Sequence, residues 1–225
     1  MKHSVVEIAD YMGKLVQILQ EGFGKRLLYV GLQGSYSRGE ANGNSDIDIM
    51  VVLDDLHMTD MDKYRQIILS LEHGDKSCGF ICGGSELANW NACEICQLVH
   101  TTKDYFGTLA TLVPSYTTED ERTYIKISAG NLYHEICHSY IHSPNRNDKE
   151  GLRASYKSVF FILQNVYYLC NGEFIRTQKE LLSRLEGIDK KVLATSLWLK
   201  TQEEYDFEEA YSLLFDWCKM ILQTI

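Results

Sequence analysis

The stretch GLQGSYSRG, residues 31–39, followed by SDIDI, residues 45–49, decides the fold of this chain. The apolar residues ahead of Gly34 are typical of a buried strand that ends where a polar loop begins. Gly34 lets backbone N–H groups approach an anion closely, and Ser35 adds a hydroxyl donor. Arg38 adds a charged contact from a short helix that we expect to open at Ser35. The segment is typical of a loop that binds phosphate groups.

Two aspartates stand one residue apart in the second part of this stretch. Residues i and i+2 of a strand project from one face, so Asp46 and Asp48 point together, with Cα atoms about 7 Å apart. Ile47 and Ile49 then point into the core. Two carboxylates on one rigid edge, beside a phosphate loop, suit Mg²⁺ held against substrate phosphates. We therefore predict a Mg²⁺ site at this aspartate pair.

The segments around this stretch mix helix and strand. Apolar residues recur at helical spacing after Ile8, and short apolar runs bounded by polar segments predict buried strands. The expected elements are a helix from Ile8 to about Gly22, strands at 27–32 and 46–53, a helix at 59–71, and strands at 77–82 and 94–100.

The second half of the chain has a different character. After Pro114 every periodic segment predicts a helix, and the expected helices are 118–142, 152–170, 177–187 and 206–222. Such a shift in element type marks a domain boundary. The sequence therefore predicts an α/β (α+β) catalytic domain over residues 1–113 and a helical bundle domain over residues 114–225.

Composition excludes several classes of protein. The net charge of −9 opposes a long nucleic acid as the main partner, because such proteins usually carry a basic face. No run of about 18 apolar residues predicts a membrane span, and the first residues lack the pattern of a signal peptide. Seven cysteines are an odd number and are expected to be reduced, while Cys93 and Cys96 lack the second pair of a zinc ribbon. A cytoplasmic location is expected.

The motif as a whole resembles the DNA polymerase beta-like nucleotidyltransferase superfamily. The resemblance lies in Gly34 and Ser35 after the first strand and in Asp46 and Asp48 on the next, within GSYSRGEANGNSDIDIMV. Within the superfamily, the chain is most similar to the aminoglycoside adenylyltransferases, in which a helical bundle follows the catalytic domain. The resemblance implies a small mixed sheet and two-metal transfer of a nucleoside monophosphate from an NTP, with ATP as the expected donor. The implied acceptor is a hydroxyl of a small molecule, an aminoglycoside-like antibiotic being one candidate, and the implied leaving group is pyrophosphate.

Two parts of the family pattern are less regular here. Relatives offer a lysine to the nucleotide phosphates from a Gly-hydrophobic-Ser/Thr-Lys stretch, which implies this role for Lys179, although Gln178 intervenes. Relatives also supply a third carboxylate from a later strand, but the strand expected at 77–82 contains no acid. Asp75, Glu86 and Glu94 are the nearest substitutes, and Glu94 is our choice because it begins an apolar, strand-like run.

Two other functions remain open at this point. His134-Glu135-Ile136-Cys137-His138 is formally HExxH, the pattern of a zinc hydrolase, with His134 and His138 on one helical face. His142 extends the stripe, but three residues at i, i+4 and i+8 span about 12 Å and cannot easily reach one ion. Helix packing or the lining of an acceptor pocket explains the stripe as well. The third reading is a nucleotide-binding sensor that lost catalysis together with the third acid.

Overall fold

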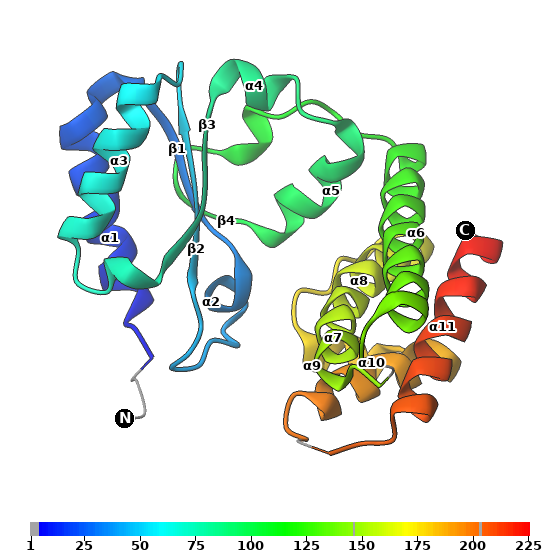
Figure 1. Ribbon diagram of the computed structural model, residues 1–225. Helices are drawn as coiled ribbons and strands as arrows, with labels where there is room; N and C mark the ends of the chain where they lie inside the picture. Colours follow the sequence, from blue (N-terminus) through cyan, green and yellow to red (C-terminus); the bar gives the residue numbers. More distant parts are fainter. Residues whose placement is uncertain (1–4, 146, 203) are drawn as a thin grey trace. The chain divides into compact units, whose positions relative to one another are not determined.

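The computed structural model describes residues 5–145, 147–202 and 204–225. The first four residues, which we interpreted as unlike a signal peptide, lie outside the described residues. The chain divides into two compact units, with the division between Tyr116 and Thr117 (Figure 1). No described helix is both long enough and apolar enough to cross a membrane.

The amino-terminal unit is a four-stranded mixed sheet with helices on both faces, which confirms the α/β (α+β) fold class (Figure 1). The strands lie in the order β3-β2-β1-β4; β2 pairs antiparallel with β1 and parallel with β3, and β4 pairs antiparallel with β1. The elements of this unit are α1 (Ile8–Phe23), a 3-10 turn (Gly24–Arg26), β1 (Leu27–Leu32), α2 (Gly34–Arg38), β2 (Ile47–Leu53), α3 (Met58–Ser70), a 3-10 turn (Gly74–Lys76), β3 (Ser77–Gly83), α4 (Gly84–Ala88), α5 (Ala92–Thr101), β4 (Lys103–Phe106) and a 3-10 turn (Leu109–Thr111).

Alternation along β2 creates a separate apolar cluster on each face of the sheet. Ile47 and Ile49 are fully buried in the cluster that α1 and α3 cover. Met50 and Val52 point to the opposite cluster, beneath α4 and α5. Asp48 is two residues before Met50, so it belongs to this second face and extends it past the end of the apolar cluster.

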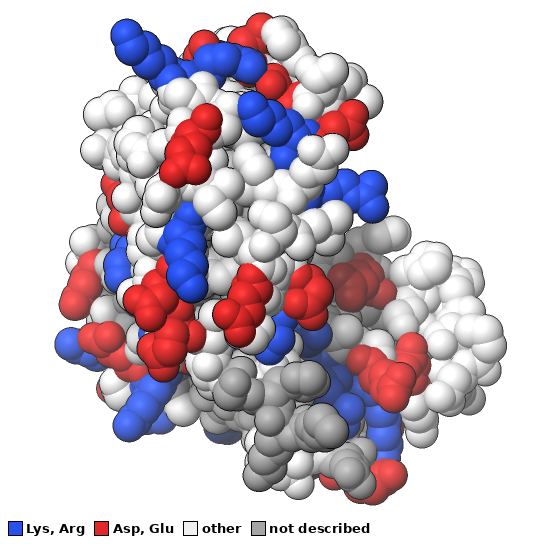
Figure 2. All heavy atoms as spheres, turned by 90° about the vertical axis from the view of Figure 1, so that its left-hand side faces the viewer, with Lys and Arg blue, Asp and Glu red and all other residues white. Residues whose placement is uncertain are grey.

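The outer surface of α1 and α3 carries charges of both signs. Figure 2 views this side of the structure, and Lys or Arg side chains alternate there with Asp or Glu side chains. The visible face therefore has no continuous basic surface of the kind that long nucleic acids favour.

The described residues of the carboxyl-terminal unit form helices joined by loops, and none of them forms a strand. A single apolar core joins α6, α8, α10 and α11, with Trp217, Tyr156 and Phe160 among its largest fully buried side chains. The elements are α6 (Thr118–His142), α7 (Lys149–Ser155), α8 (Lys157–Asn171), α9 (Gln178–Arg184), α10 (Gly187–Leu199) and α11 (Phe207–Thr224).

The secondary structure differs from the sequence prediction in several places: Asp46 lies just before β2, and α4 and β4 were not predicted. The strand predicted at 94–100 is wrong, since these residues lie in α5, which Asn91 caps by accepting a hydrogen bond from the Cys93 backbone N–H. The helix predicted at 152–170 is interrupted at Tyr156, although the backbone there keeps near-helical angles (φ −61°, ψ −19°). The helix predicted at 177–187 ends at Arg184, and Gly187, with a positive φ of 57°, instead begins α10, which the sequence analysis did not predict.

Candidate active site

Gly34 lies directly against the carboxylate of Asp48. It has a positive φ of 65°, and a Cβ atom at this position would lie 1.8 Å from Asp48 Oδ2. A side chain is therefore excluded both by the backbone conformation and by space. The Gln33 backbone N–H donates to the Asp48 carbonyl at 2.8 Å, which ties the end of β1 to the start of β2. In the turn after β1, no side chain therefore separates the backbone of Gly34 from the Asp48 carboxylate.

The short helix α2 holds this turn in place. Ser37 Oγ donates to the carbonyls of Gly34 at 3.2 Å and of Thr101 at 3.1 Å, which joins the turn to the end of α5. Ser35 lies half-buried in the first turn of α2. Gly39 ends the helix in the left-handed conformation, with φ 70°. The proposed phosphate-binding residues Gly34 and Ser35 are therefore adjacent on a turn that two other elements support.

Asp46 and Asp48 bring two like charges to this turn. Asp48 is half-buried and Asp46 is exposed, while the intervening Ile47 is fully buried. Burial raises the pKa of Asp48, the negative charge of Asp46 raises it further, and Arg38 partly offsets both. The protein thus offsets only part of the free-energy cost of the negative charge on ionised Asp48. A bound cation would offset the rest. Oxygen ligands of this kind fit Mg²⁺.

Arg38 lies within electrostatic reach of Asp48 and also binds an acid of its own. Its Nε donates to Glu40 Oε2 at 2.8 Å. The structure thus places Arg38 beside Gly34, Ser35 and Asp48, with its guanidinium oriented by Glu40.

The neighbouring strand β3 contains no acid. Asp48 is paired with Cys78 in the parallel register, and the Cys78 thiol lies within electrostatic reach of Tyr64 on α3. Asp75 precedes β3 at this same end. Glu86 follows β3 at the opposite end, roughly 20 Å away along a seven-residue strand. The strand register therefore separates Glu86 from the aspartate pair.

Glu94 lies in the first turn of α5, not on a strand. Its exposed side chain accepts a hydrogen bond from Trp90 Nε1 at 2.6 Å. Trp90 in turn stacks on Phe80 of β3, with ring centroids 6.0 Å apart. Because Phe80 packs against the same cluster as Met50, Glu94 lies over the face of the sheet to which Asp48 belongs.

A further acid on this face escaped the sequence analysis. Asp104 of β4 is paired with Gly31 and accepts a hydrogen bond from the Tyr29 hydroxyl at 2.6 Å. Burial and this bond to Asp104 raise the pKa of Tyr29, so the tyrosine remains a donor. Only β1 separates Asp104 from β2, a lateral distance of about 10 Å. The four residues of β4 are too short and too polar to give a strand signal, which explains why the acid was missed.

Two groups of predicted residues lie in the helical unit. Lys179 is exposed on the first turn of α9, so its phosphate-binding role stays a prediction. His134 and His138 lie exposed on α6, and Glu135 Oε1 accepts a hydrogen bond from Ser155 Oγ at 2.5 Å. Within the described residues no group of three His, Cys, Asp or Glu side chains could hold a metal ion. The third ligand that a catalytic zinc needs is therefore not found among them.

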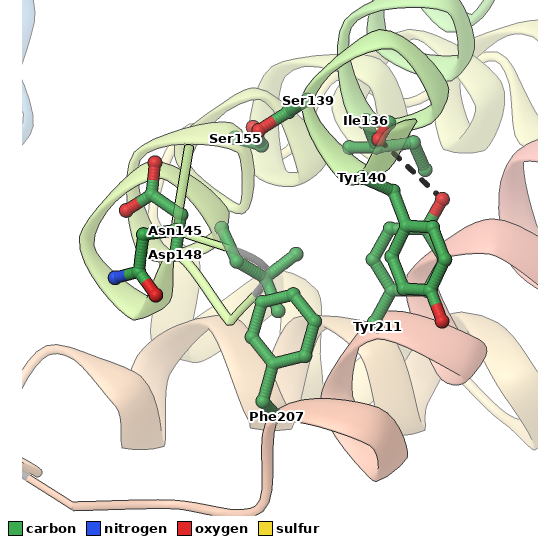
Figure 3. Close-up of a pocket in the computed structure, with 9 residues that line it drawn as sticks. Ile136, Ser139, Tyr140, Asn145, Asp148, Ser155, Phe207 and Tyr211 are labelled. Carbon is green, nitrogen blue, oxygen red and sulfur yellow. Dashed lines mark hydrogen bonds between the residues drawn. The ribbon is translucent and has the colours of Figure 1, made fainter. Parts of the chain in front are cut away.

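The helical unit also contains a small, partly open pocket with room for about one water molecule. Aromatic rings from Tyr140, Phe207 and Tyr211 form one side, and Asp148 with Asn145 forms another (Figure 3). Asp148 is also the N-cap of α7, since its Oδ1 accepts from the Gly151 backbone N–H at 2.9 Å.

Comparison with known proteins agrees with this geometry. Residues 12–77, which run from α1 to the first residue of β3 and include both aspartates, match the family model described as a nucleotidyltransferase domain. These residues form a nucleotidyltransferase domain. The resemblance to the polymerase beta-like superfamily is thereby confirmed, and the domain is of the kind found in nucleotidyltransferase enzymes.

The chain is similar to several individual proteins, of which two are described below. A Methanocaldococcus jannaschii protein, inferred to be a protein adenylyltransferase, is 36% identical over 66 residues, which are 29% of this chain and 64% of that protein. The chain therefore matches less than two thirds of that relative's length. The crystal structure of spectinomycin adenyltransferase AAD(9) from Enterococcus faecialis, with ATP and spectinomycin, covers 96% of this chain and 99% of its own, with 16% identity and a TM-score of 0.59. This second likeness is one of fold, and it extends over the residues of both units.

Proposed function

We propose that the protein transfers a nucleoside monophosphate from an NTP, with ATP as the donor, to a hydroxyl of a small molecule. The observation that carries this proposal is the contact of the Gly34 backbone with the Asp48 carboxylate. This contact brings the proposed phosphate-binding turn and the aspartate pair together at one edge of the sheet. Phosphoryl-type transfer needs this combination, because catalysis depends on holding phosphates and compensating their charge.

Asp46 and Asp48 would hold Mg²⁺, and the fit rests on the charge they leave uncompensated. When bound, the metal neutralises negative charge on the phosphates. The backbone at Gly34 and the hydroxyl of Ser35 bind the NTP phosphates, and Arg38 adds positive charge. The acceptor hydroxyl attacks the α-phosphorus, the bond from that phosphorus to the bridging oxygen breaks, and pyrophosphate leaves.

In this mechanism a general base takes the proton of the acceptor hydroxyl, and carboxylates are the bases that this face of the sheet offers. Glu94 and Asp104 are the two candidates, and a hydrogen bond from Trp90 or Tyr29 orients each. Glu94→Gln and Asp104→Asn distinguish them: loss of the base lowers kcat and flattens the acid limb of the pH profile, while the other variant stays close to wild type.

The decisive experiment measures pyrophosphate release from each NTP with Mg²⁺ across aminoglycosides, lincosamides and common hydroxyl metabolites. The Asp48→Asn protein is the control. Release that depends on the acceptor and vanishes in the variant supports the transferase and names its acceptor class. A protein hydroxyl as acceptor is tested in the same assay, since the archaeal relative is inferred to act on proteins.

The alternative function is a nucleotide sensor, and one observation favours it. No acid stands on β3 next to Asp48, where Cys78 occupies the paired position. If calorimetry shows that ATP binds but no acceptor leads to pyrophosphate release, the sensor hypothesis would be favoured over the transferase hypothesis.

A further inference from the structure

The histidine stripe of α6 is a sequence motif that the proposed function does not use. His134, His138 and His142 are all exposed and follow one another at intervals of four residues. The ring centroids of His134 and His138 are 6.0 Å apart, whereas those of His138 and His142 are 4.7 Å apart. The stripe therefore consists of one close pair and one more distant ring.

The distance between two ring centroids shows which pair already approaches the separation of two rings that share a metal ion. A metal–nitrogen bond of about 2.1 Å places the centre of each imidazole roughly 3.2 Å from the ion. Two rings then lie about 5.2 Å apart at a tetrahedral angle and about 4.5 Å apart at a right angle. The close pair, at 4.7 Å, falls within this interval. The 6.0 Å separation of the other pair exceeds it.

We propose that His138 and His142 chelate a divalent transition-metal ion, Zn²⁺, Ni²⁺ or Cu²⁺, at the carboxyl-terminal end of α6. Neither ring makes a hydrogen bond or ion pair within the described part of the chain, so the ring nitrogens are available. The described residues offer no third ligand, so the remaining positions are taken by water or by a donor from another molecule. The site is thus an open surface site and not the closed four-ligand site of a structural zinc.

This site is chemically distinct from the aspartate pair. Imidazole nitrogens prefer transition metals, and carboxylate oxygens prefer Mg²⁺, so excess Mg²⁺ saturates one site without blocking the other. A metal that joins residues four apart also ties the last turn of α6 to the turn before it. Binding to the folded helix therefore raises the unfolding temperature.

The test is a calorimetric titration of the full chain with Ni²⁺, under reducing conditions and with millimolar Mg²⁺ present. We expect His138→Gln and His142→Gln each to weaken the strongest site by about tenfold or more, because chelation is lost. His134→Gln is the matched control on the same helix and should leave the affinity unchanged. The rise of the unfolding temperature with Ni²⁺ should follow the same order.

Two results would overturn the proposal. Equal weakening in all three variants would mean that the rings bind metal without pairing. Unchanged affinity in all three would place the metal elsewhere, for example at the exposed thiols of Cys78 and Cys170. Helical circular dichroism of each variant checks its fold, and failure of the proposed transferase leaves the outcome untouched because the assay does not involve catalysis.

Discussion

At the scale of single residues, the negative charge of Asp48 that would bind the metal also destabilises the folded protein. Its raised pKa means that the folded state favours the protonated carboxyl, so stability from this group is present at low pH and is lost as the pH rises through that pKa. Asp48→Asn removes the charge. We expect the variant to lose nucleotidyl transfer by about two orders of magnitude or more and to unfold at a higher temperature than wild type at pH 7.

Pyrophosphate release and thermal unfolding, both measured at pH 7, check this prediction. Mg²⁺ should raise the unfolding temperature of wild type but not of the variant, because the ion binds the ionised pair. An active variant, or one that is less stable than wild type, would contradict the role assigned to Asp48.

The glycine at the start of α2 gives a second prediction at this scale. Gly34→Ala adds a Cβ within 1.8 Å of Asp48 Oδ2 and also strains the backbone, so we expect activity to fall by about 100-fold or more. Gly39→Ala is the matched control, because φ there is 70° but nothing lies within 4 Å of the added atom. It should cost about 1 kcal/mol of stability and little activity. Comparable activity of the two variants would show that the contact with Asp48 is unimportant.

At the scale of elements, the capping box of α6 is the clearest case. Thr117 Oγ1 accepts from the Asp120 backbone N–H at 3.3 Å, and the Thr117 N–H donates to Asp120 Oδ2 at 2.8 Å. Thr117→Ala should lower the free energy of unfolding of the helical unit by about 1 kcal/mol, and Thr117→Ser should restore most of it. Urea denaturation followed by circular dichroism at 222 nm measures both. An alanine variant as stable as wild type would mean that water replaces the cap.

The elements also show what sequence alone could and could not predict. Strands β1, β2 and β3 lie within a residue of the predicted bounds, because each contains a dense apolar run between polar loops. The segment 94–100 misled the prediction: Ile95, Leu98 and Val99 fit a helical face as well as a strand. Asn91 was the missed signal, since an N-cap residue precedes the run. The aspartate pair and Gly34 could be predicted because they form one short sequence motif. Asp104 could not, because it joins the site only through the pairing of β4 with β1, which is distant in sequence.

At the scale of the whole molecule, the division of the chain predicts how it unfolds. The amino-terminal unit has its own two apolar clusters, and the helical unit has a separate core around Trp217. We propose that residues 1–113 and 114–225 are independent domains. A fragment of residues 117–225 should therefore be helical and should unfold cooperatively, with a midpoint close to that of the same unit in the full chain.

Tryptophan fluorescence tests this directly, because Trp217 is fully buried in the helical unit and Trp90 lies in the other. In Trp90→Phe the fluorescence follows the helical unit alone, and its midpoint in the full chain can be compared with that of the fragment. A fragment without a cooperative transition would show that the helical unit depends on the rest of the chain.

The hairpin formed by β1, α2 and β2 has a consequence for how the protein folds. The bare turn at Gly34 and the carboxylate at Asp48 belong to one continuous segment, and the Gln33 to Asp48 hydrogen bond closes it. Contacts between residues close in sequence cost little chain entropy and form early, whereas the parallel pairing of β3 requires α3 as a crossover. The residues that would bind metal and phosphate can therefore assemble before the sheet is complete. In hydrogen-exchange labelling during refolding, amides of β1 and β2 should become protected ahead of those in β3.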